Sequence, residues 1–281
     1  MAEVVLITGC STGIGRDMAN ELTRLGFTVV ATARKPDTME NLRADLRLPL
    51  DVTDPKSVER AVAKTMQKYD RIDVLINNAG FGSRGMVEEI PMETVQAVYD
   101  VNVFGVLRMI HSVAPIMRRQ GSGRIINISS IAGRVVTPVN GVYSSTKFAL
   151  EALSDALRWE LAPFGVFVVL IEPGVINTHF SGTFQKQGVS NEQITRSPYK
   201  HLYEKIANLS ARMRTSGSGP EVVTRTALKA ITSAQPKARY LAGVNLPSRL
   251  LLLLRDHIWE PVASRIFKFQ MEDSNANNDQ I

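Results

Sequence analysis

The sequence predicts an α/β fold built as a single domain around a doubly wound, mostly parallel sheet. Short apolar runs recur along residues 3–180, and segments with helical periodicity separate them. This alternation is typical of βαβ units, whose parallel strands are buried on both faces. A glycine-rich segment follows the first apolar run, and polar residues follow several of the others. Ligands of doubly wound sheets bind at such strand ends.

The predicted elements alternate along most of the chain. Strands are expected at residues 3–8, 27–33, 48–50, 72–76, 124–128, 166–171 and 239–242. Helices are expected at residues 14–25, from 54 onward, and at 92–119, about 143–162, 199–213 and 221–231. Gly26 is a typical helix stop, and Asp54 followed by Pro55 is a typical helix start.

Composition narrows the class of protein. The 281 residues carry a net charge of +6 and include one cysteine, Cys10, so no internal disulfide is possible. We expect no signal peptide and no membrane span, which favours a cytoplasmic location. The basic residues are scattered, so we predict no nucleic-acid partner, although the charge could guide an acidic partner. No metal site is predicted.

The glycines after the first strand predict a phosphate-binding turn. Gly9, Gly13 and Gly15 stand between that strand and a helix, together with Ser11 and Ile14. Glycines allow a close approach of the backbone to a pyrophosphate, and a helix N-terminus offers free N–H groups. The spacing differs from the usual G-x-G-x-x-G, and a turn needs glycine in any case, so an ordinary turn is the alternative.

Arg34 follows the second strand directly, after Ala33. An acidic residue near this strand end binds the ribose 2′-hydroxyl of NAD, whereas an arginine accommodates the 2′-phosphate of NADP. The sequence therefore predicts NADP(H) over NAD(H); a solvated loop charge is the alternative. Asp51 follows the third strand, and Asn78 and Gly80 follow the fourth, so these residues are expected beside the same ligand.

Tyr143 and Lys147 are four residues apart and would lie on one face of a helix. A phenol is a poor acid or base near neutral pH, because its pKa is about 10. A neighbouring ammonium group favours the phenolate and would lower that pKa. The hydroxyl of Ser130 could hold a carbonyl oxygen while the tyrosine transfers a proton. Tyr–Lys pairs at this spacing are also common on ordinary helix surfaces.

Together, these motifs resemble the short-chain dehydrogenase/reductase family over about residues 3–180, which implies a Rossmann-type fold. Thr8-Gly9-x3-Gly13-Ile14-Gly15 is similar to its cofactor motif, and Asn77-Asn78-Ala79-Gly80 to a motif that stabilises its sheet. Asn102, Ser130, Tyr143 and Lys147 stand at the positions of its catalytic tetrad. Pro173, Gly174 and Thr178 are similar to its nicotinamide-side motif.

The resemblance implies hydride transfer between a nicotinamide and a carbonyl or alcohol carbon. Tyr143 would be the acid/base, and Ser130 would orient the substrate oxygen. Lys147 would lower the tyrosine pKa and hold the ribose, and Asn102 would support a proton relay through water. Ala33 and Arg34 match an NADP-preferring pattern, but Thr12 stands where some such members have a second basic residue. A homo-dimer or homo-tetramer, packed through residues 92–119 and 143–162, is also implied.

The remaining predictions concern the substrate side and the C-terminal region. Residues 1–245 would form the catalytic domain with a substrate lid at about 175–218, followed by a helical extension at 246–271 and a disordered tail at 272–281. The candidate pocket residues are Val139, Val175, Phe180 and Phe184. Their apolar character suggests a lipophilic carbonyl substrate of a steroid, retinoid or fatty-acyl kind.

Several alternatives stay open at this point. Each candidate pocket residue could be ordinary core. The apolar and basic segment 248–269 could lie on a membrane surface, although a cover for the pocket or a subunit contact is favoured. The protein could instead reduce 3-oxoacyl thioesters, or bind NADP(H) as a sensor without catalysis.

Overall fold

The computed structural model describes residues 2–178, 188–215 and 217–253. Seven parallel strands form one sheet in the order β3-β2-β1-β4-β5-β6-β7. The strands are β1 (Val4–Ile7), β2 (Thr28–Ala33), β3 (Leu46–Pro49), β4 (Val74–Asn77), β5 (Gly123–Ile128), β6 (Val166–Pro173) and β7 (Arg239–Ala242). The predicted doubly wound α/β fold is confirmed, and the strand order reverses direction between β1 and β4.

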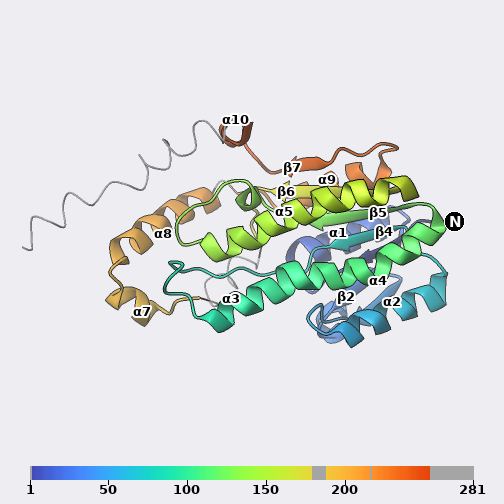
Figure 1. Ribbon diagram of the computed structural model, residues 1–281, viewed down its shortest axis with the longest axis horizontal. Coiled ribbons are helices and arrows are strands. Elements are labelled where there is room, and N and C mark those ends of the chain that lie inside the picture. Colours follow the sequence, from blue (N-terminus) through green and yellow to red (C-terminus); the bar gives the residue numbers. More distant parts are fainter. Residues whose placement is uncertain (1, 179–187, 216, 254–281) are drawn as a thin grey trace, which may run out of the picture.

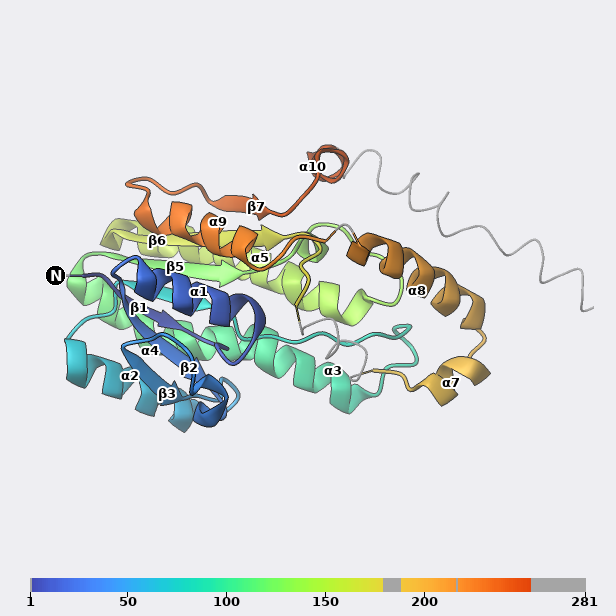
Figure 2. The same ribbon diagram turned by 180° about the vertical axis from the view of Figure 1, so that it is seen from behind.

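Helices cover both faces of the sheet. The helices α2 (Pro55–Tyr69), α4 (Gly105–Gln120) and α5 (Gly141–Leu161) pack on one face, which is the nearer one in Figure 1. The helices α1 (Gly13–Arg24) and α9 (Glu221–Thr232) pack on the other face, seen in Figure 2. Each strand of the sheet centre is therefore buried on both sides, which explains why its sequence is a continuous apolar run.

The segment predicted as one helix over 92–119 contains an irregular turn. It consists of α3 (Met92–Tyr99), a π-helical turn at Asp100–Phe104, and α4. A Cβ atom on Gly105, just after the turn, would lie 2.7 Å from a methyl carbon of Val52, so helix and loop are in close contact there. Single π-helical turns inside α-helices are frequent at functional sites.

Beyond the carboxyl ends of the strands, the chain forms α7 (Asn191–Arg196), α8 (Lys200–Thr215) and α10 (Leu246–Leu253). Figure 2 shows α7 and α8 extending past α3, away from the sheet. The predicted amphipathic segment at 199–213 corresponds to α8, and α10 begins where the C-terminal extension was expected. The predicted tail at 272–281 lies outside the described residues. Among the described helices, none is long and apolar enough to cross a membrane.

Candidate active site

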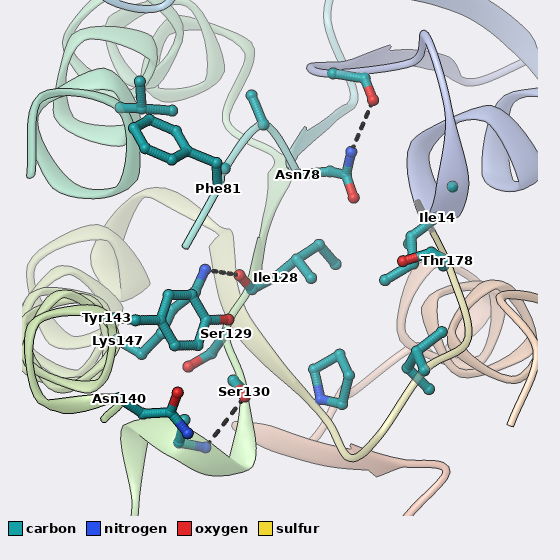
Figure 3. A pocket seen from close by; sticks show the side chains of 18 of the residues that line it. Ile14, Asn78, Phe81, Ile128, Ser129, Ser130, Asn140, Tyr143, Lys147 and Thr178 are labelled. Atoms are coloured by element: carbon teal, nitrogen blue, oxygen red, sulfur yellow. Dashed lines mark hydrogen bonds between the residues drawn. The ribbon is translucent and has the colours of Figure 1, made fainter. Parts of the chain in front are cut away.

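A cavity of about 910 Å³ opens at the carboxyl ends of the strands. Figure 3 shows Ile14, Asn78 and Thr178 on one side of it and Ser130, Tyr143 and Lys147 on the other. Fourteen of the predicted site residues line this cavity: Gly9, Ser11, Gly13, Ile14, Arg34, Asp51, Asn78, Gly80, Ser130, Tyr143, Lys147, Pro173, Gly174 and Thr178. Among the predicted catalytic and cofactor-binding residues, Gly15 and Asn102 are not part of the lining.

The glycine-rich segment forms an open cradle at the start of α1. Gly9 and Gly13 have φ angles of 75° and 58°, a region that other L residues adopt at a cost. The N-cap residue Thr12 makes no side-chain cap hydrogen bond, so the first N–H groups of α1 are not satisfied by it. The cradle thus presents backbone donors and the positive end of a helix dipole to the cavity, as an anion requires.

Gly15 belongs to the packing beneath this cradle. The Asn78 side chain donates hydrogen bonds to the carbonyl oxygens of Thr8 and Gly9, at 2.9 and 3.1 Å. A Cβ atom on Gly15 would lie 2.4 Å from Asn78 Nδ2 and 2.5 Å from the Gly9 oxygen. The Thr8 hydroxyl accepts from the backbone N–H groups of Asn78 and Ala79, both at 3.0 Å. Gly15 therefore allows α1 to approach the strand ends closely.

Tyr143 and Lys147 lie one turn apart on α5, as the spacing predicts. The Lys147 Nζ atom donates to the Ile128 carbonyl oxygen at 2.8 Å and lies 5.8 Å from the centre of the Tyr143 ring. Ser130 precedes a short 3₁₀ turn, and its hydroxyl accepts from the Ala132 N–H at 3.1 Å (Figure 3). The end of β5 and one face of α5 thus bring the three predicted groups together.

Burial changes the acidity of both α5 groups. It raises the pKa of Tyr143 to about 12, and the hydrogen bond with Ser130 opposes that rise. It lowers the pKa of Lys147 to about 8, and the negative charge of Glu151 opposes that fall. The expected lowering of the Tyr143 pKa by Lys147 is not seen, because the loss of hydration dominates. Tyr143 is therefore a protonated phenol at neutral pH.

Asn102 lies in the π-helical turn, behind the cavity wall. Its Oδ1 atom accepts from the Phe81 N–H at 3.1 Å, and its Nδ2 atom donates to the Phe81 oxygen at 2.8 Å and to Thr146 Oγ1 at 3.1 Å. A Cβ atom on Gly80 would lie 3.1 Å from Asn102 Oδ1. Asn102 therefore fixes the loop after β4 against α5, and its part in a proton relay stays a prediction.

Arg34 directly follows β2, is exposed and lines the cavity. Arg16 of α1, which was not predicted from the sequence, carries a second guanidinium at the glycine cradle. Its Nη1 atom donates to the carbonyl oxygens of Ser11 and Thr38, at 3.4 and 3.1 Å. Arg16 thus ties the glycine cradle to the loop that follows Arg34.

Asp51 lines the cavity at the end of β3. Its Oδ1 atom accepts from both the N–H and the hydroxyl of Thr53, at 2.9 and 2.8 Å. These bonds hold the carboxylate in one orientation at the cavity wall.

Two buried polar atoms of the wall were not predicted from the sequence. Ser129 Oγ and Asn140 Oδ1 have no hydrogen-bond partner among the described residues, and both residues line the cavity. Buried polar atoms usually have partners, so both are suited to bind a ligand or a water molecule. Ser129 stands beside Ser130 in the sequence, and only the orientation in the structure distinguishes the two hydroxyls.

The outer wall of the cavity is formed partly by α8, through Ile206, Leu209 and Ser210. Arg84 Nη2 donates to Ser210 Oγ at 2.8 Å, and the Tyr203 hydroxyl donates to Glu89 Oε2 at 2.7 Å. Hydrogen bonds of this kind connect α8 to the loop after β4. Helical periodicity predicts α8, but no local signal in the sequence indicates which of its residues face the cavity.

The four predicted pocket residues have different outcomes. Val175 lines the cavity. Val139 is absent from the lining; it is buried in a small apolar cluster with Met86, Tyr203 and Ile206. It also has a φ angle of 71°, which is unfavourable for a β-branched residue, just before the helix that carries Tyr143. Phe180 and Phe184 lie outside the described residues.

Comparison with known proteins agrees with this geometry. The family model for short chain dehydrogenases matches residues 3–188. The chain is 35% identical to 3-ketodihydrosphingosine reductase of Bacteroides thetaiotaomicron, over 92% of this chain and 93% of the relative. It is 37% identical to 17-beta-hydroxysteroid dehydrogenase type 1 of Homo sapiens, over 93% of this chain and 82% of the relative.

A solved structure has the same architecture. A short-chain dehydrogenase from Streptomyces avermitilis superimposes with a TM-score of 0.78 at 30% identity, covering 94% of this chain and 97% of the other. The chain therefore belongs to the short-chain dehydrogenase/reductase family and is an oxidoreductase.

Proposed function

We propose that the protein is an NADP(H)-dependent oxidoreductase that transfers a hydride between the nicotinamide and a carbonyl or alcohol carbon of a lipophilic substrate. One observation carries this proposal: a phosphate-binding cradle and the Ser130, Tyr143 and Lys147 side chains line the same cavity. A cavity of about 910 Å³ lies at the upper end of the range for ligand sites, which suits a dinucleotide and a substrate together.

The residues present fit a nicotinamide dinucleotide. A Cβ atom on Gly9 would lie 2.9 Å from the Ala79 Cα atom, so the cradle depends on a glycine at this position. The pyrophosphate would bind the N–H groups at the start of α1, and Arg34 would receive the 2′-phosphate. Lys147 would hold the ribose on the nicotinamide side, beside Pro173 and Gly174. When bound, the cofactor supplies or accepts the hydride.

Side chains of the protein would transfer the proton that accompanies the hydride. In reduction, Tyr143 Oη would donate its proton to the substrate oxygen as negative charge develops there. The Ser130 hydroxyl would donate a hydrogen bond to the same oxygen and hold it in place. The Lys147 ammonium would stabilise the tyrosinate that remains. In oxidation each step runs backwards, with the tyrosinate as the base.

The substrate side of the cavity supports a lipophilic substrate. Its wall includes Phe81, Val135, Val175, Ile206 and Leu209, which come from four separate segments of the chain. Apolar walls with a few polar groups are typical of sites for lipophilic ligands. The names of two relatives also refer to lipophilic compounds, a ketodihydrosphingosine and a hydroxysteroid.

The choice of cofactor can be tested with Arg34→Ala. A hydrogen bond between a guanidinium and a phosphate contributes about 1.5–3 kcal/mol, so kcat/KM for NADPH should fall about 10- to 100-fold. The value for NADH should stay nearly constant, because NADH lacks the phosphate. Lys35→Ala is the matched control, since Lys35 is adjacent and exposed but does not line the cavity. An equal loss with both cofactors would refute the assignment of Arg34 to the phosphate.

The proposed oligomer would pack through α4 and α5. A second hollow of about 440 Å³ lies between these helices, lined by apolar residues such as Leu107 and Leu157. Light scattering at micromolar concentration should give at least twice the mass of the 31.0 kDa chain. A monomer under these conditions would contradict the proposal. The cytoplasmic location stays a prediction.

A further inference from the structure

Below the catalytic pair, α5 carries a buried acidic residue with no role in the reaction described above. Glu151 stands one turn beyond Lys147 and is 6% exposed, while Lys147 is 7% exposed. Residues four apart on a helix have Cβ atoms about 5–6 Å from each other. Tyr143, Lys147 and Glu151 therefore form one stripe along a single face of α5.

The Glu151 end of this stripe is tightly packed, whereas Tyr143 and Lys147 line the cavity. A Cβ atom on Gly133, in the 3₁₀ turn after Ser130, would lie 3.1 Å from the Lys147 oxygen and 3.2 Å from Glu151 Cγ. The turn thus packs directly against α5, and a methyl group there would need its neighbours to shift slightly. Charges interact more strongly in such a place than in water, because the effective dielectric constant is lower.

Glu151 is held by an arginine from the neighbouring strand. Arg239 of β7 binds Glu151 Oε2 through Nε at 2.9 Å and Asp155 Oδ2 through Nη2 at 2.6 Å. The same Nε atom lies 3.3 Å from Glu172 Oε1 of β6. Glu172 also pairs with Arg134 at 3.3 Å. The groups around Glu151 are thus Lys147 and Asp155 on α5, Glu172, Arg239 and Arg134.

The second carboxylate oxygen of Glu151 is not bound by Arg239. Its Oε1 atom is buried and has no hydrogen-bond partner among the described residues. Burial together with the charge of Glu151 raises the pKa of Glu172. The Glu151 and Glu172 carboxylates both lie within ion-pair distance of the same Arg239 Nε atom. A buried carboxylate is costly, and it is retained only where its charge is compensated. Lys147 is the nearest cation along the helix.

We propose that Glu151 is a positioning residue for catalysis: its carboxylate, fixed on Arg239, is the countercharge that keeps the buried Lys147 side chain as an ammonium. This inference rests on the proposed function, in which that ammonium stabilises the Tyr143 phenolate. Without Glu151, burial alone would act on Lys147, and its proton would be lost at lower pH. The sign agrees with the opposing effect of Glu151 on the Lys147 pKa noted above.

The test follows the ionisation of Lys147 in cofactor-free protein, by NMR of protein carrying ¹³C-labelled lysine. The Lys147 signal is identified as the one missing from Lys147→Met. In Glu151→Gln the proton affinity of Lys147 should fall about tenfold or more, as expected for the loss of an opposite charge one turn away. In Arg239→Gln it should rise, because Glu151 then has less competition for its charge.

Asp155→Asn is the matched control, because Asp155 binds the same arginine but is two turns from Lys147. It should leave the Lys147 titration unchanged. A loss of packing around Arg239 would move all three variants in one direction, and that result would overturn the proposal. So would an unchanged titration in Glu151→Gln. If that variant fails to fold, Arg239→Gln remains as the test, and an unchanged or lowered proton affinity of Lys147 in it would overturn the proposal.

A second readout separates this inference from the proposed function. The titration needs neither cofactor nor substrate, so a failure to reduce any ketone would count against the proposed function and leave the titration result standing. Where turnover is found, the phenolate loses its stabilising charge at lower pH in Glu151→Gln. The rise of the oxidation rate with pH, which reports ionisation of Tyr143, should then occur at higher pH in that variant and stay in place in Asp155→Asn.

Discussion

Replacement of Tyr143 by phenylalanine is expected to lower kcat for ketone reduction with NADPH by about 10²- to 10⁴-fold, the usual contribution of a general acid. The ring keeps its volume and its place on α5, and only the hydroxyl that faces the cavity is lost. The measurement is NADPH oxidation with a panel of lipophilic ketones and aldehydes. NADPH binding, followed by fluorescence titration, should change little.

Tyr240→Phe is a suitable control for this variant. Tyr240 lies on β7 and is not part of the cavity lining. Its hydroxyl accepts a hydrogen bond from the Lys237 N–H at 3.0 Å. It should keep normal turnover. Near-normal turnover in Tyr143→Phe would remove Tyr143 from the mechanism, whereas NADPH binding without turnover in the wild type would favour a sensor.

The pH dependence follows from the same residue. Burial raises the pKa of Tyr143 to about 12, so the phenol is protonated throughout the neutral range. Reduction needs the protonated form of Tyr143. The reduction rate should therefore fall through ionisation of Tyr143 only at strongly alkaline pH. Oxidation needs the phenolate, so its rate should increase with pH towards that value. The bound cofactor and the Lys147 ammonium, whose own pKa is about 8, both act on this profile.

The placement of Tyr143 and Lys147 together in the cavity wall could be predicted from the sequence because it depends on local geometry. Tyr143 and Lys147 are four residues apart, and helical periodicity alone places them on one face. The strands could be predicted for a similar reason, since burial on both faces requires a continuous apolar run. Arg34 and Asp51 followed from their positions directly after strands.

Other parts of the site depend on contacts between distant segments. The inward face of α8 is set by bonds such as Tyr203 to Glu89, which are 114 residues apart. The π-helical turn around Asn102 interrupts a sequence whose periodicity is that of an ordinary helix, next to a close contact between Gly105 and Val52. Arg239, which binds Glu151, comes from β7, 88 residues further along the chain, so the sequence of α5 alone does not indicate it.

Gly15 belongs to a motif that could be identified from the sequence, but its contacts could not be predicted in this way. The motif associates it with the cofactor, but in the structure it lies against Asn78 and the Gly9 oxygen, outside the cavity lining. Its contribution to binding is therefore indirect. Any side chain at this position must push α1 away from the ends of β1 and β4, and the cradle moves with the helix.

Gly15→Ala should therefore lower both stability and activity. The Cβ atom would lie 2.4 Å from Asn78 Nδ2 and 2.5 Å from a backbone oxygen, which is overpacking of a kind that costs about 1–3 kcal/mol. Thermal unfolding should occur about 2–5 °C lower. A displacement of the cradle by about 1 Å can reduce kcat/KM for NADPH by about 10²-fold.

Gly26→Ala separates the two effects, because Gly26 follows the other end of α1. Its φ angle is 89°, yet a Cβ atom there would meet no atom within 4 Å. Alanine at this position should lower the free energy of unfolding by about 1–2 kcal/mol, because its backbone conformation is unfavourable. The cradle should stay in place. We expect lower stability with unchanged kcat/KM for NADPH. If Gly15→Ala behaved in the same way, the close contact beneath the cradle would affect folding and have no part in cofactor binding.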